Sequence, residues 1–322
     1  MTDYFLGKRE QIAICPEDSY GALGTKTVAA DGFIPGMNIV VTPDFAQDWQ
    51  EVLQTGTDSV EVLSFQPSVH LYPFTMEFVV TDWRWLKYCA FGTVGNVGSG
   101  NYTHTFVLNK AVASFTMEWA KRSTSGGNEV ITATGCVIKK ATLKFTAGTG
   151  ANAGFIKVTC DCVAQSIAIG TSITTVTANS RTPFQFRMVK YTFEGTEIKE
   201  VNNGEFTIDT GIDENKSRYC NSTVNQNIFE PIITVVRYNG RININYNTDA
   251  YSTVFRTDAA MTSTNKLEFI ENASTNKIVL TFTSPIMTSL KNPTNIDGID
   301  NIDIIMKMTS LAPVATDTLG TY

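Results

Sequence analysis

Short runs of β-branched and aromatic residues recur along almost the whole chain, and this pattern restricts the fold more than any other feature. Residues 39–42, 75–80, 114–119, 204–209 and 277–283 either alternate apolar with polar side chains or are continuously β-branched and aromatic. No regular succession of long helices separates these runs, which makes the alternating β/α core of a Rossmann or barrel enzyme improbable. The sequence predicts an all-β protein.

Two short helices are expected within this β pattern, and they occupy corresponding places. Thr81 and Asp82 precede an amphipathic run over residues 83–91 that stops at Gly92, and Thr248 with Asp249 precedes a similar run over residues 250–256. Each begins with a capping residue and follows a strand. The two starting positions are 167 residues apart, about half of the chain.

The order of the other elements also repeats, which indicates an internal duplication. In both halves, a strand that begins at a glycine is followed by a polar loop, a second strand and finally a long two-stranded unit. The expected organisation is an N-terminal arm with the first strand in residues 1–30, a first β domain in 31–168, a linker in 169–183, a second β domain in 184–312 and a tail in 313–322.

The composition leaves little equipment for catalysis. Of 322 residues only two are histidines, 17% are charged, and the formal net charge is −6. His70 and His104 lack any nucleophile motif nearby. Cys160 and Cys162 lie on one strand face, but no second pair completes a metal site. We therefore expect no catalytic site, metal or cofactor, and the acidic balance argues against DNA held by phosphate neutralisation.

The cellular compartment is predicted from the residues at the N-terminus and from the length of the apolar runs. No basic and apolar leader opens the chain, and no run reaches the ~18 apolar residues of a membrane helix. We expect synthesis and folding in a cytoplasm, reduced structural cysteines and no membrane partner.

Apolar residues on a predicted insertion are the best candidates for contacts between subunits. Phe45, Trp49, Val52 and Leu53 are spaced to suit a short amphipathic helix, although a projecting loop fits equally well. Exposed apolar anchors of this kind usually need a partner surface. Trp83 and Trp85 are further candidates: one is expected to pack inward and the other to lie at the helix flank or a subunit contact. A carbohydrate-stacking platform is the alternative for this pair.

Four segments carry a resemblance to a known family. They are SFTMEW at residues 114–119, TGCVIKKATL at 134–143, IKVTCDCVAQ at 156–165 and AICPEDSYG at 13–21. Together with the helix expected over residues 83–91, they resemble the major tail tube proteins of tailed bacteriophages and archaeal tailed viruses. The likeness covers residues 10–200 in sequence and the second half by architecture alone.

The resemblance implies a β-sandwich or half-barrel whose strands continue from one subunit to the next around a ring. Three duplicated chains would give a pseudo-sixfold ring, which is favoured, and six chains are possible. Stacked rings would form the virion tail tube, assembled in the host cytoplasm with tail terminator, baseplate or tape-measure proteins. Viral DNA would pass through an acidic lumen without specific binding.

Two other classes of protein remain as alternatives. A viral fibre, spike or decoration β-sandwich that binds a host or capsid surface would stay a discrete oligomer with an exposed binding face. A glycoside-cleaving enzyme would need a concave pocket with a carboxylate pair, and nothing in the sequence selects such a pair.

Overall fold

The computed structural model describes residues 10–52, 64–109, 111–122, 127–148, 154–177, 180–213, 231–245, 261, 264–272, 275–291 and 301–320. For residues 46–52, 64–71 and 94–97 it describes the backbone alone. The second expected helix, over residues 250–256, lies outside the described part of the chain.

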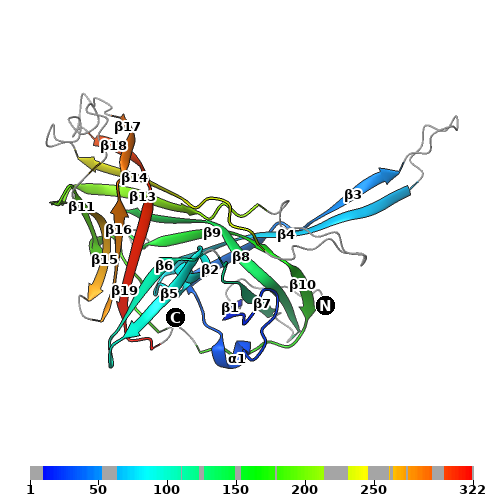
Figure 1. Cartoon of the computed structure of the whole chain (residues 1–322). Helices are drawn as coiled ribbons and strands as arrows, with labels where there is room; N and C mark the ends of the chain where they lie inside the picture. The colour runs from blue at the N-terminus through cyan, green and yellow to red at the C-terminus, as the bar shows by residue number, and fades with distance from the viewer. Residues whose placement is uncertain are drawn as a thin grey trace, which may run out of the picture.

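The described chain is built almost entirely of antiparallel strands, which confirms the all-β prediction (Figure 1). The strands are β1 Gln11–Pro16, β2 Gly36–Pro43, β3 Ala46–Val52, β4 Ser64–Val80, β5 Phe91–Val97, β6 Tyr102–Leu108, β7 Phe115–Arg122, β8 Asn128–Thr146, β9 Lys157–Ala164, β10 Ser166–Gly170, β11 Val189–Phe193, β12 Thr196–Ile198, β13 Val201–Asp209, β14 Arg237–Asn245, β15 Asn265–Asn272, β16 Asn276–Thr283, β17 Ile286–Lys291, β18 Asn301–Met308 and β19 Ser310–Asp317.

One large sheet draws strands from both halves of the chain. Its main path runs β17-β18-β14-β13-β8-β9-β4-β2, with β1, β7, β10 and β3 attached beside it. Strand β8 of the first half pairs directly with β13 of the second, from Lys140 opposite Asp209 to Thr146 opposite Asn203. Among the described strands the sheet is not closed, so β17 and β2 end this path.

A second sheet, in the order β12-β11-β15-β16-β19-β6-β5, also joins the halves, because β19 near the C-terminus pairs with β6. Apolar side chains from both sheets form a single large core cluster that includes Phe78, Phe145, Phe206 and Phe269. Alternation along the strands produces this core. In β13, for example, Phe206 and Ile208 are buried while Glu205 and Asp209 face away from the core.

The order of strand pairing in the second half repeats that in the first. In the large sheet, β2-β4-β9-β8 corresponds to β13-β14-β18-β17, and each series follows the same order along the chain. Beside it, β1-β7-β8-β10 corresponds to β11-β15-β16-β19. The long strand β8 thereby corresponds to β16 and β17 together.

The registers of the corresponding ladders agree to the residue. Thr134 pairs with Ser166 in the first half, and Thr283 pairs with Ser310 in the second. Likewise Ile138 pairs with Cys162, and Met287 pairs with Met306. In both comparisons, adding 149 to the number of the first residue and 144 to that of its partner converts the first-half pair into the second-half pair. A bulge follows Ile138 in β8, and a bulge follows Met287 in β17. Because bulges are positional features of a strand, their coincidence strengthens the correspondence.

The helix expected over residues 83–91 is shorter than its pattern indicates. A 3₁₀ helix, η2, spans Arg84–Tyr88. Asp82 contributes as expected of an acidic residue at a helix start, since its Oδ1 accepts the backbone N–H of Arg84 at 3.1 Å. The turn ends at Ala90, whose φ of +64° is left-handed, and β5 begins at the next residue. Two further short helices, α1 at Val28–Asp31 and η3 at Phe186–Met188, were not expected.

Candidate assembly surfaces

The insertion that carries Phe45 and Trp49 forms part of a β-hairpin. Strands β3 and β4 extend together away from the two sheets (Figure 1). Strand β3 continues the pairing of β2 along β4 in the same register, and between them the Asp44 N–H donates to the Pro73 carbonyl at 2.9 Å. The segment is therefore a strand, where the spacing had suggested a helix or loop.

The predicted contact residues of this segment occupy different places. Phe45 lies at the base of the hairpin, where its ring meets Tyr72 edge-on at 5.9 Å and packs against the core. Trp49 and Val52 belong to β3, whose side chains are outside the described part, and Leu53 lies outside the described residues altogether. The proposal that they contact a neighbouring subunit stays a prediction.

Trp83 and Trp85 lie in the protein core. Their exposed fractions are 1% and 2%, and their rings pack against Phe78, Phe184 and Phe269 at centroid distances between 5.3 and 6.2 Å. A side chain buried within one subunit cannot contact another while the subunit keeps this conformation. These residues therefore have no part in the interface proposed below, nor are they accessible for stacking on a sugar.

The two ends of the large sheet expose apolar side chains. Val40 on β2 is 56% exposed and Ile286 on β17 is 46% exposed. Within the chain, the residue equivalent to Ile286 is Val137 on β8, which is 0% exposed because it packs with Val163 and Ile212. The same strand position is thus covered where a neighbouring strand follows and uncovered where the sheet ends. Unpaired strand edges readily add further strands.

The face of the large sheet that points away from the core, here called the outer face, is polar and mixed in charge. The described ladder positions on this face carry five acidic and seven basic residues: Glu77, Asp161, Glu205, Asp209 and Asp303, with Lys140, Lys144, Lys157, Arg237, Arg241, Lys291 and Lys307. The face is therefore not acidic.

Ion pairs join several of these charges across the outer face. Lys157 Nζ lies 3.0 Å from Glu77 Oε1, Lys144 Nζ lies 3.7 Å from Glu205 Oε2, and Arg241 lies 2.6 Å from Asp303 Oδ2. Burial alone would raise the pKa of Asp303, but hydrogen bonds from Asn243 and Arg241 outweigh it and lower this pKa. Each pair neutralises a cation locally, although such exposed pairs contribute only about 0–1 kcal/mol to stability.

The motif residues that carry the family resemblance hold the N-terminal arm. Glu17 Oε1 accepts the Gly135 N–H at 2.8 Å and the Thr116 hydroxyl at 2.7 Å, while its Oε2 accepts the Gly21 N–H at 2.9 Å. Gly135 has φ +62°, and a Cβ atom there would lie 2.6 Å from Cβ of Gln165. The glycine thus permits both the backbone bend and a close approach.

Glu118, from the same motif, fixes the segment expected to be a linker. Its side chain is buried and accepts two hydrogen bonds from Thr174, the N–H at 2.7 Å and the hydroxyl at 2.6 Å. Gln11 on β1 donates to the Thr174 carbonyl at 2.5 Å. The segment around Thr174 is therefore attached to β1 and β7.

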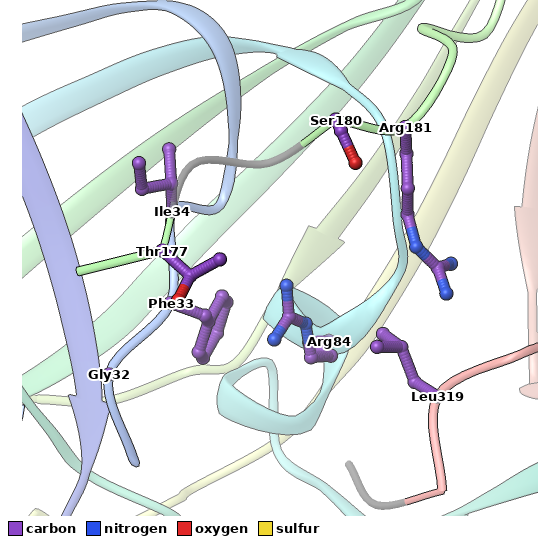
Figure 2. Close-up of a pocket in the computed structure, with 8 residues that line it drawn as sticks. All are labelled: Gly32, Phe33, Ile34, Arg84, Thr177, Ser180, Arg181 and Leu319. Atoms are coloured by element: carbon purple, nitrogen blue, oxygen red, sulfur yellow. The ribbon is translucent and has the colours of Figure 1, made fainter. Parts of the chain in front are cut away.

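A pocket of about 230 Å³ lies between residues 32–34, η2, the expected linker and the C-terminal segment, and Arg84 and Arg181 line it (Figure 2). Arg84 stacks on Phe33 at 4.0 Å and pairs with buried Asp82 at 2.8 Å, while Arg181 lies 3.3 Å from buried Asp317. Among the described residues that line it, no carboxylate, thiol or imidazole is available as a base or nucleophile. Both arginines have carboxylate partners, which favours a structural role.

His104, Cys160 and Cys162, which were considered for catalysis or metal binding, are buried in the core. His104 is buried beside Asp317, and the side chain of His70 is outside the described part. Cys160 and Cys162 are free and buried, and burial raises the pKa of both thiols. Within the described ranges, no cluster of three or more histidine, cysteine or acidic residues is arranged to hold a metal, and no helix is long and apolar enough to span a membrane.

The described part of the chain thus combines open antiparallel sheets with an extended hairpin. A family model described as phage tail tube protein matches residues 7–315, and the chain belongs to that family. It is accordingly a structural protein of the virion tail. A comparison with curated proteins gives no match.

Proposed function

We propose that this chain is the repeating subunit of a tail tube, that its copies close into rings, and that stacked rings form the channel through which viral DNA reaches the host. The observation that carries the proposal is the pair of open strand edges at the ends of the large sheet. An incomplete sheet with exposed Val40 and Ile286 is stabilised when a neighbouring copy supplies the missing strand.

The repeated pairing order supports two tube-type units in each chain, centred on residues 31–168 and 184–312, with β1 added to the first unit and β19 to the second. Both units contribute four strands in the same order to one sheet. Three chains would then supply six units, giving a ring with pseudo-sixfold symmetry. A ring of six chains would place twelve units around a wider channel.

The outer face of the large sheet is the proposed channel wall, because the opposite face is covered by the core and the second sheet. Its mixed charge revises the expected acidic lumen. Free cations would bind DNA phosphates by releasing counterions, whereas cations paired with Glu77, Glu205 and Asp303 are less available. The wall would let DNA slide without holding it.

The hairpin of β3 and β4 is proposed to contact the next ring, since it extends beyond the body of the subunit (Figure 1). This surface would also be the meeting point with the tail proteins that bind the ends of the tube.

Electron microscopy of the purified protein, combined with mass measurement, tests this function. The expected particles are rings whose mass equals three chains of 35.3 kDa, stacked into tubes at high concentration. A discrete oligomer without a central channel would favour the fibre or decoration alternative. A chain that stays monomeric over a wide range of concentration and salt would contradict the proposal.

A further inference from the structure

We infer that the contact between neighbouring chains copies the junction already present within each chain. This inference rests on the proposed function. Within the chain, β8 of the first unit pairs with β13 of the second. The equivalent of β8 is β17, and the equivalent of β13 is β2, and these two strands form the open edges of the same sheet. In the transferred register, the end of β17 in one chain lies opposite the segment that follows β2 in the next chain.

The equivalence of β2 and β13 follows from the ladders on their other side. Strand β2 pairs with β4 as β13 pairs with the equivalent strand β14. Thr42 lies opposite Thr75 in the first ladder, and Glu205 lies opposite Arg241 in the second, so equivalent residues of β2 and β13 differ by 163 in number. Val40 opposite Glu77 and Asn203 opposite Asn243 give the same difference. In both strands an irregularity in the ladder immediately precedes these positions.

The register of the β8–β13 ladder, applied to the equivalent residues at the two sheet edges, specifies which residues lie opposite each other between chains. Thr142 opposite Thr207 becomes Lys291 opposite Asp44, and Ala141 opposite Ile208 becomes Leu290 opposite Phe45. The backbone of Asp44 still pairs with β4, so the strand is extended at this point and its other edge faces outward.

The chemistry of the transferred pairs is complementary. Lys291 and Asp44 are both exposed and carry opposite charges, and directly opposed charges of opposite sign stabilise a strand pair. Phe45 and Leu290 are partly buried and pack against the core, whereas their counterparts Ile208 and Ala141 are each only 1% exposed. Pairing would therefore complete the burial of two apolar side chains and align one ion pair in the same register.

Cysteine pairs test this register in the assembled protein. In a Cys220→Ser background, Asp44→Cys with Lys291→Cys and Phe45→Cys with Leu290→Cys should form disulfides between chains on oxidation, giving a ladder up to the ring on a non-reducing gel. The matched control, Asp44→Cys with Ile286→Cys, is out of register and should not cross-link.

Charge reversal provides a second readout that does not need oxidation. Lys291→Asp alone, or Asp44→Lys alone, should reduce the assembled fraction at least about tenfold at low salt, because like charges then face each other. The double reversal should restore assembly to within about twofold of the unchanged protein.

The outcomes separate the two proposals. Rings that form without cross-links in the transferred register, or with preferential cross-linking of the control pair, would overturn this inference and leave the tube function standing. A double reversal no better than the single ones would also overturn it. Absence of rings in the unchanged protein would overturn both.

Discussion

His104 and Asp317 are 213 positions apart in the chain, yet Nε2 of the histidine lies 3.2 Å from Oδ1 of the aspartate, and both side chains are buried. The pair joins β6 of the first half to β19 at the end of the second. Arg181 contacts the other carboxylate oxygen of Asp317 at 3.3 Å. One carboxylate thus connects three distant segments.

Removing this carboxylate should destabilise the subunit. Asp317→Ala leaves buried His104 without this partner, and we expect a loss of about 3 kcal/mol in the free energy of unfolding. Chemical denaturation of the purified chain measures this loss. Ser310→Ala, at an exposed position of the same strand, is the control and should change stability by less than about 0.5 kcal/mol. Equal effects of the two substitutions would contradict the role of the pair.

Three glycine substitutions separate backbone strain from steric contact. Gly135→Ala combines a left-handed φ with a close approach to Gln165 and should cost about 2 kcal/mol. Gly195→Ala has φ +80° but nothing within 4 Å, and should cost about 1 kcal/mol. Gly170→Ala meets neither difficulty and should be nearly neutral. Thermal unfolding of the three variants should rank them in this order, and any other order would disprove the explanation.

The buried thiols should resist modification. Burial and the nearby carboxylates of Asp31 and Glu17 raise the pKa of Cys15 from its ordinary value of 9.0 to about 11. At pH 8 its thiolate fraction is then roughly 100-fold lower than in an unfolded chain. In a Cys220→Ser variant, a small thiol reagent should react with the native protein only slowly and with all five described cysteines in denaturant. Rapid labelling of the native protein would refute this expectation.

The same shift makes stability depend on pH in a defined direction. A raised thiol pKa stabilises the folded state at neutral pH, and this contribution is lost as pH rises from the unfolded value toward 11.

Neutralising the carboxylates of the outer face should convert this proposed channel wall into a DNA-binding surface. Glu77→Gln, Glu205→Gln and Asp303→Asn together leave Lys157, Lys144 and Arg241 without their acidic partners. Assembled tubes of this variant should retain short duplex DNA at low salt and release it as salt increases. Replacing the three cations by glutamine instead is the matched control and should not cause retention. Retention that does not respond to salt would argue against this wall assignment.

Shortening the hairpin should separate ring closure from stacking. Replacing residues 48–69 with Asn-Gly keeps the pair Gln47 opposite His70 next to a favourable two-residue turn. Rings of normal mass should form without growing into tubes, as judged by electron microscopy. Tubes of unchanged length would show that the hairpin has no role in stacking.

Local alternation of apolar and polar side chains predicted most strands, because burial of one sheet face requires an apolar residue at every second position. It failed for β3, where Trp49 and Val52, together with the preceding Phe45, match a helical spacing while pairing with β4 decides the conformation. The β-branched run at residues 232–236 forms only an isolated bridge between Ile233 and Ile212. Pairings over long separations, such as β6 with β19, leave no local signal.

The candidate surfaces were predicted less completely than the fold, for a related reason. Trp83 and Trp85 were chosen for their size and spacing, but only the tertiary structure shows that both rings are enclosed in the core. The edges at Val40 and Ile286 are apolar residues in ordinary strand patterns, and their exposure depends on which strand ends the sheet. Likewise, the partnership of Glu17 with Gly135 spans 118 positions.

The two units that meet at the β8 to β13 junction belong to one chain, and this limits the number of units that a ring can contain. A ring built from such chains always contains an even number of units, so closures with five or seven units are excluded by connectivity alone. Half of the junctions form during folding at the high effective concentration of a single chain, and only the remainder require encounters between molecules. Because the two units differ in sequence, the proposed ring of three chains would present a threefold alternation of surfaces, which would fix the rotational orientation of any protein that binds its ends.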